Sequence, residues 1–189
     1  IRIACAYPLD TFDVADATTL TSRKPDYDSA FDAWAGDTGS FNVLTNKLRA
    51  SSAANLSAVL NFGESDCRVG VKFTRTGSQS GLILRWSDAS NFLIVRSDGT
   101  TLFLTKWEAG VATTVASVAL TWTAATEKWL IVDLHGDDFY VYADWTLQFT
   151  GTSTFNNTAT KHGIGGRATD TADRWNDFGG WSPMFSGRV

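Results

Sequence analysis

The stretch GLILRWSDASNFLIVRSDGTTLFLTKWEAG at residues 81–110 decides the fold. Its apolar and polar residues alternate in three runs, 81–87, 91–97 and 100–107. Alternation with a period of two is typical of β-strands. Asp98-Gly99 between the last two runs is a strong two-residue hairpin signal, because both turn positions need positive φ. The stretch therefore predicts an antiparallel meander of three strands.

The two sides of this meander differ in chemistry if Ser97 pairs with Thr100. One side is apolar and should face a core; it holds Leu82, Leu84, Trp86, Leu93, Val95, Leu102 and Leu104. The other side mixes cations with aromatic rings, and it holds Ile83, Arg85, Phe92, Ile94, Arg96, Phe103, Thr105 and Trp107. A register error of one residue would exchange the two sides.

The segment KWLIVDLHGDDFYVYAD at 128–144 repeats this design around a turn at Gly136-Asp137. Its apolar side holds Leu130, Val132, Leu134, Phe139, Val141 and Ala143. Its mixed side holds Trp129, Ile131, Asp133, Tyr140 and Tyr142. Each hairpin is thus predicted to bury one side and to present aromatic and charged groups on the other.

Similar runs recur every 8–12 residues along the whole chain, which is typical of an all-β sandwich or barrel. The remaining predicted strands are 41–49, 56–62, 67–74, 111–118, 128–135, 138–143, 145–150, 161–165 and 174–181. Only 26–37 could form a short helical turn, or else an irregular loop. We therefore predict an all-β, two-sheet antiparallel sandwich, with residues 1–189 in a single domain.

Charge and hydropathy exclude some partners. The net charge is −4 and the Lys and Arg residues are scattered, so we expect no nucleic-acid binding. No apolar run approaches the roughly 20 residues that span a bilayer, so we expect no membrane insertion. The start IRIACAYPLD does not look like a signal peptide, and we expect a mature product, a fragment or part of a longer chain. Cys5 and Cys67 could form a disulfide or remain two buried thiols.

Four segments together carry a resemblance to a known family: Asp10-Thr11-Phe12, 81–110, 128–144 and RWNDF at 174–178. In this order they resemble the concanavalin A-like lectin/glucanase jelly roll, in its laminin-G-like branch. The resemblance implies two twisted sheets, paired first and last strands, and sugar bound on the concave sheet or at the loop rim. Asp144-Trp145 departs from the Asp-Gly that is usual there. This departure implies a different turn or an aromatic ring displayed at the edge of the sandwich.

Catalysis is not expected from these residues. A retaining glycosidase needs two carboxylates about 5–5.5 Å apart, and the resemblance implies a strand with Glu-x-Asp-x-x-Glu or Glu-x-Asp-x-Glu. Glu64, Glu108 and Glu127 are the three glutamates of the chain, and each stands alone. Asp133 is the one acid on a mixed side.

Sugar binding fits the mixed sides better, because pyranose rings stack on aromatic rings and their hydroxyls bond to charged and amide groups. The predicted ligand-binding residues, taken to lie on one sheet, are Arg85, Arg96, Trp107, Asp133, Tyr140 and Tyr142. The same side chains could instead pack under a loop or against a neighbouring subunit. The resemblance also implies a structural calcium ion, for which Asp10, Asp13 and Asp177 are candidates if the two ends of the chain pair; Asp137-Asp138 is another option.

Three functions remain open at this point. The first is a non-catalytic, lectin-like module that binds a glycan or a surface polymer, as an adhesion module of a phage virion or a secreted bacterial protein. Its place would be extracellular or on a virion surface. The second is a structural virion component, such as a capsid decoration or tail protein, that contacts other subunits or forms a homo-oligomer. The third is a glycoside hydrolase.

Overall fold

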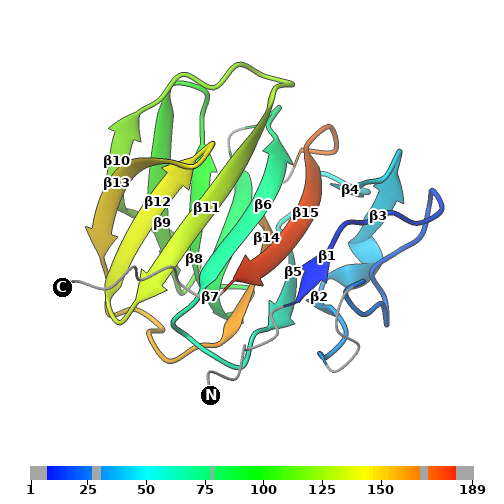
Figure 1. Ribbon diagram of the computed structural model, residues 1–189, viewed down its shortest axis with the longest axis horizontal. Helices are drawn as coiled ribbons and strands as arrows, with labels where there is room; N and C mark the ends of the chain where they lie inside the picture. The colour runs from blue at the N-terminus through cyan, green and yellow to red at the C-terminus, as the bar shows by residue number, and fades with distance from the viewer. Residues whose placement is uncertain (1–7, 27–30, 78, 167–169, 182–189) are drawn as a thin grey trace.

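Two antiparallel β-sheets packed face to face form the protein, as Figure 1 shows for the computed structural model. The structure describes residues 8–26, 31–77, 79–166 and 170–181. Sheet A has eight strands in the order β13 (Thr146–Thr152), β12 (Asp138–Ala143), β11 (Glu127–His135), β6 (Arg68–Thr74), β15 (Arg174–Trp181), β4 (Lys47–Ala50) and β3 (Phe41–Leu44), with β1 (Leu9–Asp10) paired to β15. Sheet B has seven strands in the order β10 (Val111–Ala119), β9 (Thr101–Glu108), β8 (Asn91–Ser97), β7 (Ser80–Asp88), β14 (Lys161–Gly166), β5 (Leu56–Asn61) and β2 (Ala35–Gly36).

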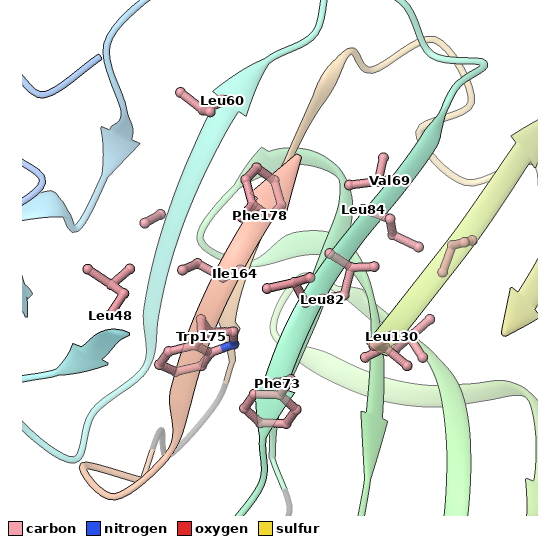
Figure 2. Close-up of a cluster of buried hydrophobic side chains, with 14 of the residues drawn as sticks. Leu48, Leu60, Val69, Phe73, Leu82, Leu84, Leu130, Ile164, Trp175 and Phe178 are labelled. Carbon is pink, nitrogen blue, oxygen red and sulfur yellow. The ribbon is translucent and has the colours of Figure 1, made fainter. Parts of the chain in front are cut away.

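The apolar core lies between the two sheets. Figure 2 shows Phe73 and Trp175 of sheet A together with Leu82 and Ile164 of sheet B, and all four are fully buried. The rings of Phe73 and Trp175 stack with their centroids 5.4 Å apart. The all-β sandwich predicted from the period-two pattern is therefore confirmed.

The predicted strands are present, with their ends within one or two residues of the expected positions, apart from 41–49. That run forms two strands, β3 and β4, joined by Thr45-Asn46 with φ of 52° and 56°. The sequence signal for this turn is weak, because neither residue is glycine. The first and last strands pair as expected, with Leu9 opposite Gly179.

The segment 26–37 forms no helical turn in its described part, where Ala35–Gly36 is strand β2. Among the described residues, the single helical element is the 3-10 helix η1 (Thr38–Ser40). No helix in the described ranges is long and apolar enough to cross a membrane. Cys67 is a buried free cysteine, as the second of the two alternatives expects, and Cys5 lies outside the described residues.

The turn at Asp98-Gly99 is wider than predicted. Ser97 pairs with Leu102 rather than with Thr100. The Asp98 carboxylate accepts hydrogen bonds from the backbone N–H groups of Thr100 and Thr101, both at 2.8 Å, which stabilises the longer connection. Because the register differs by two residues, each side chain of β8 and β9 keeps its predicted side.

A β-bulge in β7 reverses the prediction for two neighbouring residues. The register of β7 against β8 shifts between Leu84 and Asp88, and Arg85 has a φ of 48°. β7 has two more residues than β8 between the pairs Leu84–Leu93 and Asp88–Asn91, and the alternation of its side chains breaks at Arg85. Arg85, expected on the mixed side, is therefore buried, and Trp86, expected in the core, packs on the outer side of sheet B.

Candidate functional site

The six residues predicted to bind a sugar do not share one surface. Arg96 and Trp107 lie on the outer face of sheet B, as the strand register requires. Three other candidates lie on the outer face of sheet A: Tyr140 and Tyr142 are half-buried there, and Asp133 is buried. Arg85 is buried. The expectation of one sheet is wrong because the two hairpins belong to different sheets, whose outer faces point in opposite directions.

Arg85 has a structural position. Its guanidinium donates hydrogen bonds to the carbonyl oxygens of Gly136 and Ser153 and lies 4.8 Å from the centroid of the Phe139 ring. Its backbone N–H donates to Nδ1 of His162 at 3.3 Å. Burial lowers the pKa of Arg85. The side chain thus connects β7 of sheet B to the loops of sheet A.

The outer face of sheet B is covered by its own aromatic side chains. Beneath them lies a small apolar cluster, formed by Val59, Ile83, Phe92 and Ile94. Trp86 and Trp107 pack over this cluster, and the rings of Phe92 and Trp107 stack at 6.3 Å. The guanidinium of Arg96 lies 4.7 Å from the centroid of Phe103, and burial lowers the pKa of Arg96. Arg96 and Trp107 thus pack against aromatic and apolar side chains of their own sheet.

The outer face of sheet A instead carries a group of partly exposed tryptophans. Trp129 comes from β11, Trp145 from the β12–β13 turn and Trp181 from the end of β15. Their ring centroids are 5.6, 5.9 and 6.4 Å apart. Trp145 is 55% exposed. We call these three residues the tryptophan cluster; exposed apolar groups that gather in this way often mark an interaction site.

The turn that presents Trp145 has an unusual backbone. Asp144 and Trp145 have φ of 47° and 66°. A two-residue hairpin turn of this kind favours Asn-Gly or Asp-Gly, and a bulky residue with positive φ is rare. The Asp144 carboxylate accepts hydrogen bonds from the Trp129 backbone N–H at 2.9 Å and from Lys128 Nζ at 2.7 Å. The aromatic display expected from Asp144-Trp145 is thus confirmed.

A glycine makes room for the third ring of the cluster. Gly70 lies on the outer side of β6, opposite Ile131 in β11 and Gly179 in β15. A Cβ atom at position 70 would lie 2.8 Å from Cζ3 of Trp181 and 3.1 Å from Cγ1 of Ile131. The ring of Trp181 can therefore lie close to the sheet only because residue 70 has no side chain.

Charged groups beside the cluster are paired. Lys72 Nζ lies 5.3 Å from the centroid of Trp129 and 2.5 Å from the Asp177 carboxylate. The hydrogen bond from Asp177 raises the pKa of Lys72. Farther along the same face, Arg68 and Asp133 form a two-pronged ion pair, and this bond raises the pKa of Arg68. Asp133 therefore neutralises an arginine and is not a free acid.

The three aspartates considered for calcium do not fit that ion. Their carboxylates are each bonded to another side chain; the partners of Asp10, Asp13 and Asp177 are Arg23, Asn46 and Lys72. The buried Asp10 also accepts a hydrogen bond from Trp34 Nε1 at 2.8 Å. A cation already occupies two of the three carboxylates. In the described ranges, no group of three or more His, Cys, Asp or Glu residues could hold a metal ion.

The three glutamates lie on different elements. Glu64 is in the loop between β5 and β6, whereas Glu108 ends β9 and Glu127 begins β11. Lys106 Nζ lies 2.7 Å from Glu108, and Lys47 Nζ lies 2.5 Å from Glu127. These positions do not form the single strand of acids that the resemblance implied for a glucanase.

Comparison with known proteins gives the fold but no close relative. No family model and no curated protein sequence matches the chain. A β-glucanase of Bacillus licheniformis is similar in structure, with a TM-score of 0.63 and 11% identity over 94% of this chain and 98% of the other. A carbohydrate-binding module of Bacillus subtilis has a TM-score of 0.57 and 17% identity over 79% of this chain and 91% of the other.

A sialidase of Trypanosoma rangeli contains a similar region. Its TM-score is 0.61, with 10% identity over 92% of this chain and 30% of the sialidase. At sequence identities this low, the structural similarity establishes the architecture and leaves the activity open. The chain has the concanavalin A-like jelly-roll fold, which it shares with this β-glucanase and this carbohydrate-binding module.

Proposed function

We propose that this protein is a non-catalytic carbohydrate-binding module, and that it binds a glycan at the tryptophan cluster. The observation that carries the proposal is Trp145, which is exposed, has positive φ and contacts Trp129 and Trp181. The apolar C–H face of a pyranose ring stacks on such rings. Lys72 and Asp177, beside Trp129, offer a donor and an acceptor for sugar hydroxyls.

The backbone cost of this turn supports a functional role for the side chain. Glycine at position 145 would adopt the same φ without steric strain, yet the chain has tryptophan there. Strained residues tend to gather at ligand-binding and active sites. The backbone of Trp145 is strained and its ring is exposed, so this residue contributes little to the stability of the fold. We therefore infer that the ring contacts a ligand.

The positions and ion pairs of the acidic residues support binding rather than hydrolysis. Hydrolysis with retention needs two carboxylates about 5–5.5 Å apart. Asp133, the one acid predicted to bind sugar, is held by Arg68. The similar structures include both a carbohydrate-binding module and glycoside hydrolases, so the fold accommodates either function, and the acids favour the first.

Glycan arrays followed by affinity electrophoresis in polysaccharide gels test the proposal. Loss of one stacking ring, in Trp145→Ala or Trp129→Ala, should weaken binding about tenfold, since such a contact contributes about 1–1.5 kcal/mol. Trp107→Ala is the matched control, because it removes a partly buried tryptophan from the opposite face, and it should bind like the wild type.

Three results would contradict the proposal. They are the absence of any bound glycan, unchanged binding by Trp145→Ala, and loss of binding by Trp107→Ala with the cluster variants unaffected. The last result would place the site on sheet B. Release of reducing sugar from a panel of β-glucans would contradict the non-catalytic part.

A further inference from the structure

One side of the sandwich ends in two long strands without charge. Among the described strands, β10 is the edge of sheet B and β13 is the edge of sheet A, and each has a hydrogen-bonded neighbour on one side only. Figure 1 shows both strands at the same side of the molecule. The two edges come close at Gly151, where an added Cβ would lie 3.2 Å from Cβ of Ala116.

The sequence of this side contains no charged residue over two long stretches. Residues 109–126, which include β10, hold no Asp, Glu, Lys, Arg or His, and neither do residues 145–160, which include β13. Charged residues make up 19% of the chain, and they are usually concentrated at exposed positions. Four successive exposed residues begin β10, Val111–Thr114, and Val111 is 67% exposed.

The opposite edges of the same sheets are built differently. β2 has two residues and β3 has four, whereas β10 has nine. Proteins usually protect edge strands from pairing by keeping them short or by placing lysine or proline in them. β2 and β3 follow this rule through their length. β10 is long and has neither lysine nor proline, although a bulge between Thr114 and Ala116 limits its regular part to shorter segments.

We propose that Val111–Thr114 of β10 pairs antiparallel with the same segment of a second copy of this chain. A two-fold axis perpendicular to sheet B at Thr113 would place Thr113 opposite Thr113 of the second copy and Ala112 opposite Thr114, and it would join two copies of sheet B into one continuous sheet. The second copy fits this edge because an uncharged strand meets no like charge when it pairs with itself. A two-fold contact also closes on itself, which gives a dimer and not a fibre.

The measurement is the mass of the full chain in solution, by light scattering after size exclusion and by sedimentation equilibrium. We expect a dimer at about 100 µM that dissociates on dilution. Thr113→Lys would bring two ammonium groups together at the axis and should weaken the dimer at least about tenfold. Thr150→Lys adds the same charge at an exposed position of β13 and should leave the dimer intact.

Each other outcome overturns the pairing. A monomer up to about 1 mM, or a dimer that Thr113→Lys does not weaken, excludes pairing through β10. Dissociation by Thr150→Lys would assign the contact to β13 instead. Hydrogen exchange gives an independent check, since the amides of Val111–Thr114 should be protected more strongly at high protein concentration, whereas a monomer shows no such dependence. None of these results depends on glycan binding.

Discussion

Two substitutions of Trp145 separate the free-energy cost of its strained backbone from the contribution of its ring to glycan binding. Trp145→Ala and Trp145→Gly remove the same contacts with Trp129 and Trp181, but only glycine adopts the φ of 66° without strain. An L-residue in the left-handed region costs roughly 1–2 kcal/mol, and the greater freedom of glycine in the unfolded chain offsets roughly 0.5–1 kcal/mol of that gain. Trp145→Gly should therefore be about 0.5–1 kcal/mol more stable than Trp145→Ala.

The expected sign is the opposite of that at an ordinary strand position, where alanine is more stable than glycine. For a chain of this size the difference corresponds to about 1–4 °C in Tm, which differential scanning calorimetry resolves. Both variants should lose glycan affinity by the same factor, about tenfold. If alanine proved equal to glycine or more stable, the turn would not have the strained geometry described above. Binding that differed between the two variants would show that the backbone, and not the ring, contacts the glycan.

Three further changes test other parts of the structure. Gly70→Ala should displace the ring of Trp181 and weaken glycan binding about tenfold with little change in Tm; unchanged binding would exclude Trp181 from the site. Asp10→Ala should lower the free energy of unfolding by about 3 kcal/mol in urea titrations, because Arg23 loses its buried partner; a change below about 1 kcal/mol would show that Asp26 compensates. Burial lowers the pKa of His162 to about 3, so below about pH 6.5 the unfolded chain takes up a proton that the folded protein excludes, and stability should fall by about 1.4 kcal/mol per pH unit as the pH drops toward 3. His162→Gln should flatten this slope, and an unchanged slope would assign it to other groups.

The sequence was sufficient to predict the sandwich, because alternation along a strand reports directly which side is buried. Residues 129–143 illustrate this, since both sides of that hairpin are as predicted. The Asp98-Gly99 turn was placed correctly but its length was not, because the side-chain hydrogen bonds of Asp98 favour a wider connection. The side chains of β8 and β9 still lie on their predicted sides, because the register error was an even number of residues.

The site could not be predicted as a unit. A bulge at Arg85 exchanges the sides of a charged and an aromatic residue. The pattern of apolar and polar residues does not show where a strand contains such extra residues. The sheet to which each hairpin belongs depends on contacts far apart in the sequence, so Arg96 and Tyr140 could not be assigned to opposite faces in advance. The signal for the tryptophan cluster was present in Asp144-Trp145, but Trp181 joins it only through the fold.

Arg85 also bears on how the protein folds and unfolds. Its partners Gly136, Ser153 and His162 lie about 50 to 80 residues away along the chain, and contacts of such long range usually form late in folding. Interactions that are absent from the transition state affect mainly the unfolding rate. We therefore expect Arg85→Met to accelerate unfolding in denaturant-jump experiments while the refolding rate stays nearly constant. The arginine that sequence reasoning assigned to a ligand would thus set the lifetime of the folded state.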